Sequence, residues 1–137
     1  MVLHVLLIVF MTLSLPNTSV IFITSCLYLA PIIVNIFFSI YLTYYKDIHS
    51  YKRNLIFPSV STIYFIASAI LFEGTGLWPQ FANTINSVSA SANESVVIFI
   101  SPKLFDLSQI LFALLLYFSI TLLTMLILRK LKGNSNY

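Results

Sequence analysis

Charge is what this 137-residue sequence has least of: 8% of its residues are Asp, Glu, Lys or Arg, whereas 59% are hydrophobic. A typical soluble domain is about 25% charged. A small domain leaves much of its area exposed, so a soluble protein this apolar could not cover its own surface with polar groups. The scarcity of charge therefore argues against an ordinary soluble domain and indicates a protein whose solvent is a lipid bilayer.

Cysteine and glycine are also scarce. The one cysteine, Cys26, lies within an apolar run, so the chain holds neither an internal disulfide nor a C-x-x-C pair. We interpret it as a small hydrophobic residue of a helix. No phosphate-binding loop, nucleophile–base pair or metal-ligand spacing is present. We therefore expect no enzymatic activity, no cofactor and no metal.

The basic residues are concentrated in two short clusters, which are Lys46, Lys52 and Arg53 and then Arg129, Lys130 and Lys132. Nucleic-acid binding needs a basic face on a folded domain, so we expect no nucleic-acid partner. Short cytoplasmic loops of membrane proteins are rich in Lys and Arg. We therefore expect both clusters to face the cytoplasm.

The apolar runs predict an all-α membrane protein, because about 20 apolar residues are needed for one helical crossing. We expect a single domain, 1–137, formed by a four-helix transmembrane bundle. Its two termini are cytoplasmic and a long outer loop joins helices three and four. The expected ranges are about 2–22, 27–45, 55–72 and 103–131, with the outer loop at 73–102.

Two boundaries rest on local signals. Pro16-Asn17 is our first choice for the turn between the first two helices, and Thr24-Ser25 is the alternative, with Pro16 then inside helix one. At the last helix, Ser101 can cap, Pro102 suits the first helical position and Asp106 suits an early turn. The apolar run 96–100 is compatible with a strand, an interfacial segment or a re-entrant piece.

The titratable residues give little sign of chemistry within the membrane. Asp47, Glu73, Glu94 and Asp106 all fall outside the four apolar runs. Proton relays and ion pathways need ionisable groups inside a span, which argues against a proton-coupled transporter. We expect the two histidines, His4 and His49, to be solvated at the cytoplasmic interface.

Uncharged polar residues within the runs are the candidate contact points. Small and hydroxyl side chains allow helices to approach closely and to hydrogen-bond each other. Either the bundle uses them for internal packing, or one face recognises a partner helix laterally. The candidates within the spans are Asn35, Ser61, Ser68, Ser119 and Thr124.

The stretch LFEGTGLWPQF, residues 71–81, resembles a membrane exit: an apolar turn, an acid that needs water, glycines and the chain's only Trp. Trp is enriched at the membrane–water boundary. As a membrane exit, the stretch needs no further function.

Four segments together resemble the immunity proteins of pore-forming colicins, the group that protects against colicins A, B and N. They are LSLP at 13–16, YLAPIIVNIFFSIYLTYYK at 28–46, IFPSVSTIYFIASAILFEGT at 56–75 and LLYFSITLLTMLILRKLKG at 115–133. The family pattern has Leu between the acid and Thr, where this chain has Gly74. The segment before Ala30-Pro31 is also more apolar here than in that pattern.

The resemblance implies a small bacterial inner-membrane protein with four helices and cytoplasmic termini. It would bind the helical pore-forming domain of a colicin within the bilayer and stop the channel from opening. The resemblance implies contacts through the span candidates named above and, in the outer loop, through Glu73, Thr75 and Trp78. Self-association is also compatible with the polar faces. Two alternatives stay open: a small hydrophobic subunit of a respiratory membrane complex, and a small multi-pass transporter or flippase.

Overall fold

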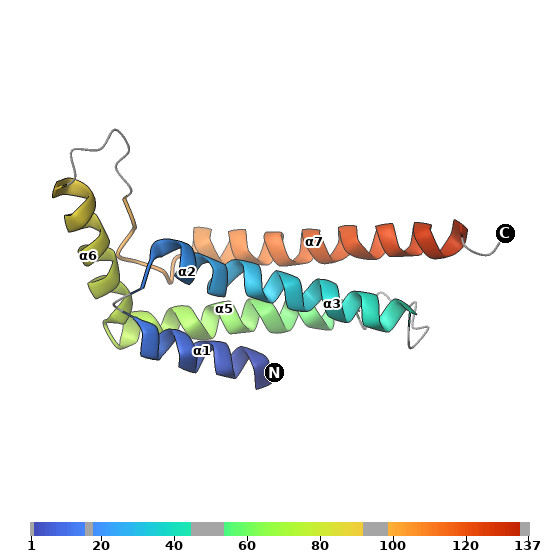
Figure 1. Ribbon diagram of the computed structural model, residues 1–137, viewed down its shortest axis with the longest axis horizontal. Helices are drawn as coiled ribbons and strands as arrows, with labels where there is room; N and C mark the ends of the chain where they lie inside the picture. The colour runs from blue at the N-terminus through green and yellow to red at the C-terminus, as the bar shows by residue number, and fades with distance from the viewer. Residues whose placement is uncertain (1, 16–17, 45–53, 92–98, 135–137) are drawn as a thin grey trace.

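The computed structural model describes residues 2–15, 18–44, 54–91 and 99–134, and all regular structure among them is helical. The long helices lie side by side and run alternately in opposite directions (Figure 1). The start of α1, the end of α3, the start of α5 and the end of α7 point towards one end of the bundle, which we call the open end. We call the opposite end, where α6 lies, the capped end.

The first helix is shorter than the sequence suggested. α1 covers Val2–Ser14 and the next helix, α2, covers Val20–Thr24. The predicted helix 2–22 was therefore wrong, since Leu15, Thr18 and Ser19 are not helical, and the predicted turn at Pro16-Asn17 lies outside the described residues. Ser19 explains the restart, because its hydroxyl accepts a hydrogen bond from the Phe22 N–H at 3.3 Å and caps α2.

The chain stays helical through Thr24-Ser25, where a turn was the alternative. It does so by widening into a π-helix, η1, at Ser25–Leu29, before it continues as α3, Ala30–Tyr44. The predicted second helix, 27–45, thus began seven residues too late, since α2, η1 and α3 form one continuous segment from Val20. A π-helix displaces the usual backbone pairing, and no sequence pattern indicated one here.

Two tyrosines from other helices hold the π-helix. The Tyr64 hydroxyl donates to the Cys26 carbonyl at 3.0 Å, and the Tyr117 hydroxyl donates to the Leu27 carbonyl at 2.5 Å. Both tyrosines are buried. Phenol groups buried in a core need a partner, and the displaced carbonyls provide one, so η1 joins the α2–α3 segment to both α5 and α7.

The remaining long helices are α5, Ile56–Gly74, and α7, Leu107–Asn134. α5 agrees with the predicted 55–72 within two residues, and Pro58 lies in its first turn, where no backbone donor is lost. α7 begins four residues later than the predicted 103. Asp106 directly precedes it and its carbonyl accepts from the Ile110 N–H at 3.0 Å, so Ser101 and Pro102 do not start the helix.

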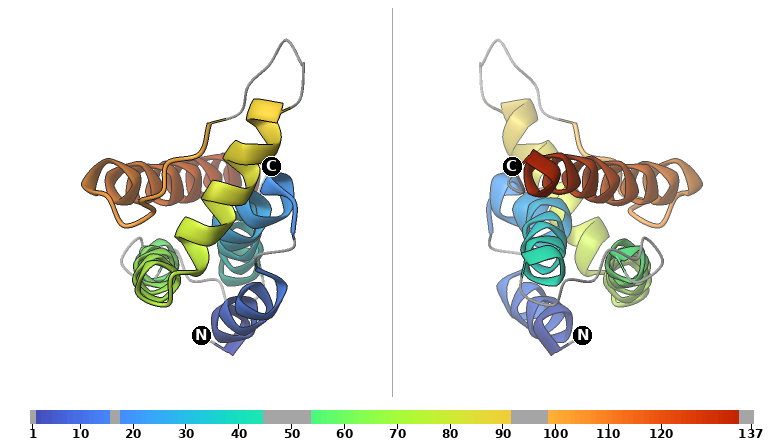
Figure 2. Two further views of the ribbon diagram at one scale, coloured as in Figure 1. Left: turned by 90° about the vertical axis from the view of Figure 1, so that its left-hand side faces the viewer. Right: turned by 90° about the vertical axis from the view of Figure 1, so that its right-hand side faces the viewer.

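The predicted outer loop, 73–102, contains a helix. α6 covers Leu77–Ser91 and lies across the capped end, steeply inclined to the other helices (Figures 1 and 2). The polar composition of residues 83–91 concealed it. The apolar residues before them recur at helical spacing, at Leu77, Trp78, Phe81, Ala82 and Ile85. The run 96–100 is described only at Phe99 and Ile100, which are in neither a helix nor a strand.

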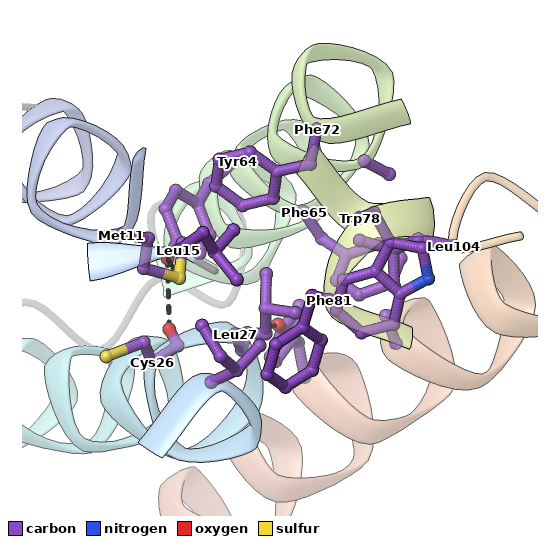
Figure 3. Close-up of a cluster of buried hydrophobic side chains, with 14 residues drawn as sticks. Met11, Leu15, Cys26, Leu27, Tyr64, Phe65, Phe72, Trp78, Phe81 and Leu104 are labelled. Atoms are coloured by element: carbon purple, nitrogen blue, oxygen red, sulfur yellow. Dashed lines mark hydrogen bonds between the residues drawn. The ribbon is translucent and has the colours of Figure 1, made fainter. Parts of the chain in front are cut away.

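The apolar core lies where α6 meets the bundle. Figure 3 shows side chains of α1, η1, α5 and α6 converging there with Leu104. Phe65, Phe72 and Phe81 are fully buried, and Trp78 packs against the Phe81 ring with 5.5 Å between the centroids. This cluster fixes α6 and the segment after it against the end of α5.

Along the rest of the bundle the usual distribution of polarity is reversed. Polar side chains line the inside, at Asn35, Ser39, Thr43, Ser61, Thr62, Ser68 and Thr121, while Leu, Ile, Val and Phe dominate the exposed surface of α1, α3 and α7. Three segments in the described part of the chain are long and apolar enough to cross a membrane: Val20–Tyr44, Ile56–Gly74 and Leu107–Leu131. Such a surface matches lipid rather than water.

Candidate functional site

The predicted span residues separate into an inner and an outer group. Asn35, on α3, and Ser61, on α5, lie in the bundle interior, where the Ser61 hydroxyl donates to the Asn35 Oδ1 at 3.0 Å. Ser68 is also fully buried and donates to the Tyr64 carbonyl at 2.8 Å. These three residues contact a partner helix only if the helices of the bundle separate. Within the bundle, the bond between Asn35 and Ser61 joins α3 to α5, and the bond of Ser68 lies within α5.

Ser119 and Thr124 lie further out on α7. Ser119 is exposed, and within the described part of the chain its hydroxyl makes no hydrogen bond. Thr124 is half-buried and its hydroxyl donates to the Ile120 carbonyl at 2.8 Å. Ser119 is therefore the span candidate that offers an unused polar group to a neighbour.

The surroundings of Ser119 are apolar and exposed. Residues three, four and seven positions away on a helix share one face with it. One of these, Leu116, is half-buried, and the other five are exposed: Phe112, Leu115, Leu122, Leu123 and Leu126. We call this set, together with Ser119, the α7 outer face. It has the form of a helix-packing surface, with one small polar residue among large apolar ones.

At the capped end, Glu73 and Trp78 have structural roles. The Glu73 carboxylate accepts a hydrogen bond from the Phe105 N–H at 2.6 Å. The Trp78 indole N–H donates to the Ser101 carbonyl at 3.0 Å, and the side chain is 8% exposed. Both residues therefore tie the segment before α7 to the α5–α6 corner.

Asn86 completes this attachment and was not anticipated. Its amide nitrogen donates to the Ile100 carbonyl at 3.0 Å, while its Oδ1 accepts from the Ile100 N–H at 2.9 Å. The Asn86 side chain thus pairs with both backbone groups of Ile100, as a neighbouring strand would. Asn86 lies in a polar, low-complexity stretch with other asparagines. No local pattern indicates which of them hydrogen-bonds to backbone distant in the sequence.

Thr75 is the exposed member of the corner. It follows the last residue of α5, and its hydroxyl donates to the Leu71 carbonyl at 2.7 Å. Gly76 follows with a φ of 73°, a conformation that favours glycine and lets the chain turn into α6. Thr75 is therefore exposed at a corner in which hydrogen bonds hold Glu73 on one side of it and Trp78 on the other.

The residues used to predict orientation are only partly described. Lys46, Lys52 and Arg53 lie outside the described residues, as does His49. Arg129 and Lys130 are exposed in the last turns of α7, and Lys132 lies in the same helix without a described side chain. Cytoplasmic exposure of the two clusters stays a prediction.

His4 differs from its prediction, because it is 8% exposed rather than solvated. It lies against α5, where its ring meets Tyr64 edge-on with 5.1 Å between centroids. In the sequence, His4 lies in an apolar run near the N-terminus, and nothing there indicated that its side chain would be buried. Neither ring nitrogen has a hydrogen-bond partner within the described structure.

A cavity of about 500 Å³ lies beside His4 at the open end. Its lining comes from the start of α1, the middle of α3 and the start of α5, and comprises Val2, Leu3, His4, Val34, Asn35, Phe38, Ile56, Phe57 and Val60. Among the residues that the structure describes, no three His, Cys, Asp or Glu side chains gather so as to hold a metal ion.

Comparisons of the chain with protein-family models, with curated proteins and with solved structures found no match.

Proposed function

We propose that this chain is a bacterial inner-membrane immunity protein, which binds the pore-forming domain of a colicin within the bilayer and prevents its channel from opening. In this proposal α1, the α2–α3 segment, α5 and α7 each cross the membrane. The open end, with both termini, faces the cytoplasm and the capped end faces outward. The resemblance of the four sequence segments to that family motivates the proposal.

The α7 outer face is the observation that carries it. A hydroxyl without a partner on a lipid-facing surface is costly, because hydrocarbon offers no hydrogen bond. A second helix packed on this face would supply an acceptor to Ser119 and bury the surrounding Leu and Phe side chains. The pore-forming domain is helical, so the proposed partner provides the kind of element that this face fits.

The capped end supports a second contact. Thr75 is exposed at a corner that Glu73 and Trp78 hold in place, and a toxin segment arriving from outside would meet this corner first. In this proposal the exposed Thr75 contacts the toxin, whereas Glu73 and Trp78 act indirectly by holding the corner in shape.

Protection of a colicin-sensitive strain is the decisive measurement. We expect cells that express the chain to survive at least one member of a panel of pore-forming colicins, and survival against none would refute the proposal. Ser119→Leu removes the hydroxyl and blocks close approach, so we expect it to abolish protection at an unchanged membrane level. Ser59→Leu is the matched control, since Ser59 is also exposed but its hydroxyl already donates to the Leu55 carbonyl.

Three further measurements separate the alternatives. If the α7 outer face served a second copy of the chain, Ser119→Leu would change the oligomeric state in mild detergent while protection persisted. If the chain were a subunit of a respiratory complex, it would co-purify with that complex whether or not colicin was present. If it were a transporter or flippase, reconstituted vesicles would show transport, and protection would again be absent.

A further inference from the structure

The open end contains several buried polar atoms without a hydrogen-bond partner in the described structure. They are Nδ1 and Nε2 of His4, Nδ2 of Asn35, Oγ of Ser39 and Oδ1 of Asn54. A buried polar group left unpaired costs about 1–3 kcal/mol, and native proteins leave few of them without a reason. The described residues at the open end therefore leave a deficit of polar partners.

Two of these residues line one cavity. His4 and Asn35 both border the cavity of about 500 Å³, from α1 and from α3. Asn35 is 1% exposed; its Oδ1 already accepts from Ser61, so what its amide lacks is an acceptor. His4 is 8% exposed and lacks partners at both nitrogens.

The rest of the lining is apolar. It includes the stacked rings of Phe38 and Phe57, whose centroids are 4.9 Å apart. A smaller cavity of about 150 Å³ between α1 and α5 shares His4 and Val60 with the first, so apolar space continues along α5. Volumes of roughly 300–1,000 Å³ with mostly apolar walls and a few polar groups are typical of small-molecule sites.

Part of the cavity lining belongs to the exposed apolar surface. Val2, Leu3 and Ile56, which line it, are each at least half exposed. In a membrane these side chains face lipid, so a molecule dissolved in the lipid reaches the cavity first. Such a molecule must bring an apolar chain for the walls and a hydrogen-bonding oxygen for His4 and Asn35.

We propose that this cavity binds one membrane phospholipid, with an acyl chain along the apolar walls and an ester carbonyl that accepts a hydrogen bond from Asn35 Nδ2 or from His4. Phospholipid is the source that matches both requirements and surrounds the protein at high concentration. α1 is the helix that closes this site, which gives the short first helix a role in retaining the lipid.

Ester and ether phospholipids separate the proposal from unspecific lipid stabilisation. The two kinds have the same chains and headgroup, but the ether form lacks the carbonyl oxygen. For the delipidated full-length protein in detergent, we expect the diester lipid to raise Tm at about three- to tenfold lower concentration than the diether lipid, as one hydrogen bond predicts. Native mass spectrometry should retain one diester lipid per chain. Equal effects of the two lipids would overturn the proposal.

Two substitutions on α5 locate the site. Val60 lines both cavities, so Val60→Trp places a bulky ring where they adjoin and we expect it to lose the retained lipid, while Ile70→Trp, on an exposed part of the same helix, keeps it. Retention of the lipid by Val60→Trp would contradict the assignment, and so would a larger Tm increase with an isoprenoid quinone than with the diester lipid. Should Val60→Trp not fold, the ester–ether comparison in the unaltered chain still decides.

Discussion

Two asparagines summarise the contrast between the ends of this bundle. Asn86, at the capped end, uses both its donor and its acceptor on the backbone of Ile100. Asn35, near the open end, uses its acceptor on Ser61 and leaves its donor unpaired in the interior. Of the unpaired buried polar atoms in the described structure, only Oγ1 of Thr18 lies away from the open-end group. Among the described residues, one such atom lies on the side of the capped end and five lie towards the open end, as expected of an end that binds something.

The largest effect should come from removing the anchor of the capped end. Trp78→Ala removes a buried ring and its bond to the Ser101 carbonyl, and substitutions of this kind cost about 3–5 kcal/mol. The measurement is the free energy of unfolding in detergent. Trp78→Phe is the control, because it keeps a ring in the core and loses only the hydrogen bond, for which about 1 kcal/mol is expected. Equal losses for the two variants would show that packing does not hold this end.

Asn86→Leu should have the next largest effect. It leaves the N–H and the carbonyl of Ile100 without their partner, and unpaired groups cost about 1–3 kcal/mol each where they are shielded. Faster amide hydrogen exchange at Ile100 should accompany the lower unfolding free energy. Asn83→Leu, at an exposed position of the same helix, provides the comparison and should leave exchange at Ile100 unchanged.

The two glycines of the corner should respond in opposite directions. Gly76→Ala places a side chain at a φ of 73° and should cost about 1–2 kcal/mol. Gly74 is the last residue of α5, and a Cβ there meets nothing within 4 Å. Gly74→Ala should therefore be neutral or stabilising by up to about 1 kcal/mol. A loss of stability in Gly74→Ala would contradict this description of the corner.

The smallest effect should come from deleting the polar pair near the open end. Replacing both partners of a buried hydrogen bond by apolar groups can be nearly neutral, so the double variant Asn35→Leu with Ser61→Ala should unfold within about 1 kcal/mol of the original chain. Ser61→Ala alone should be less stable than the double variant, because it leaves Asn35 without either partner. If the double variant were less stable than both single variants, the hydrogen bond between Asn35 and Ser61 would stabilise the bundle by more than a nearly neutral replacement implies.

The sequence predicted the apolar helices better than it predicted how they meet. The range of α5 and the all-helical class of the described residues followed from local signals and from run length. The π-helix could not be predicted, because Tyr64 and Tyr117 stabilise it from helices distant in sequence. α6 was missed because composition outweighed periodicity in a polar stretch.

The candidate contacts show the same limit. Asn35 and Ser61 were chosen as polar residues within spans, and the structure pairs them with each other. Ser119 and Thr124 were chosen for the same reason, yet only Ser119 is left without a hydrogen bond in the described structure. Residue type identified both groups, but exposure, which depends on the neighbouring helices, separates them.

The length of α1 has a consequence for the membrane itself. Its 13 residues extend about 20 Å at 1.5 Å per residue, against a hydrocarbon thickness of about 30 Å. In the proposed location, the bilayer beside α1 must thin, or the residues that flank α1 must be drawn into it, at a cost of fractions of a kcal/mol per ångström of mismatch. The protein would then deform its surroundings on one side only, and would favour thin bilayers over thick ones.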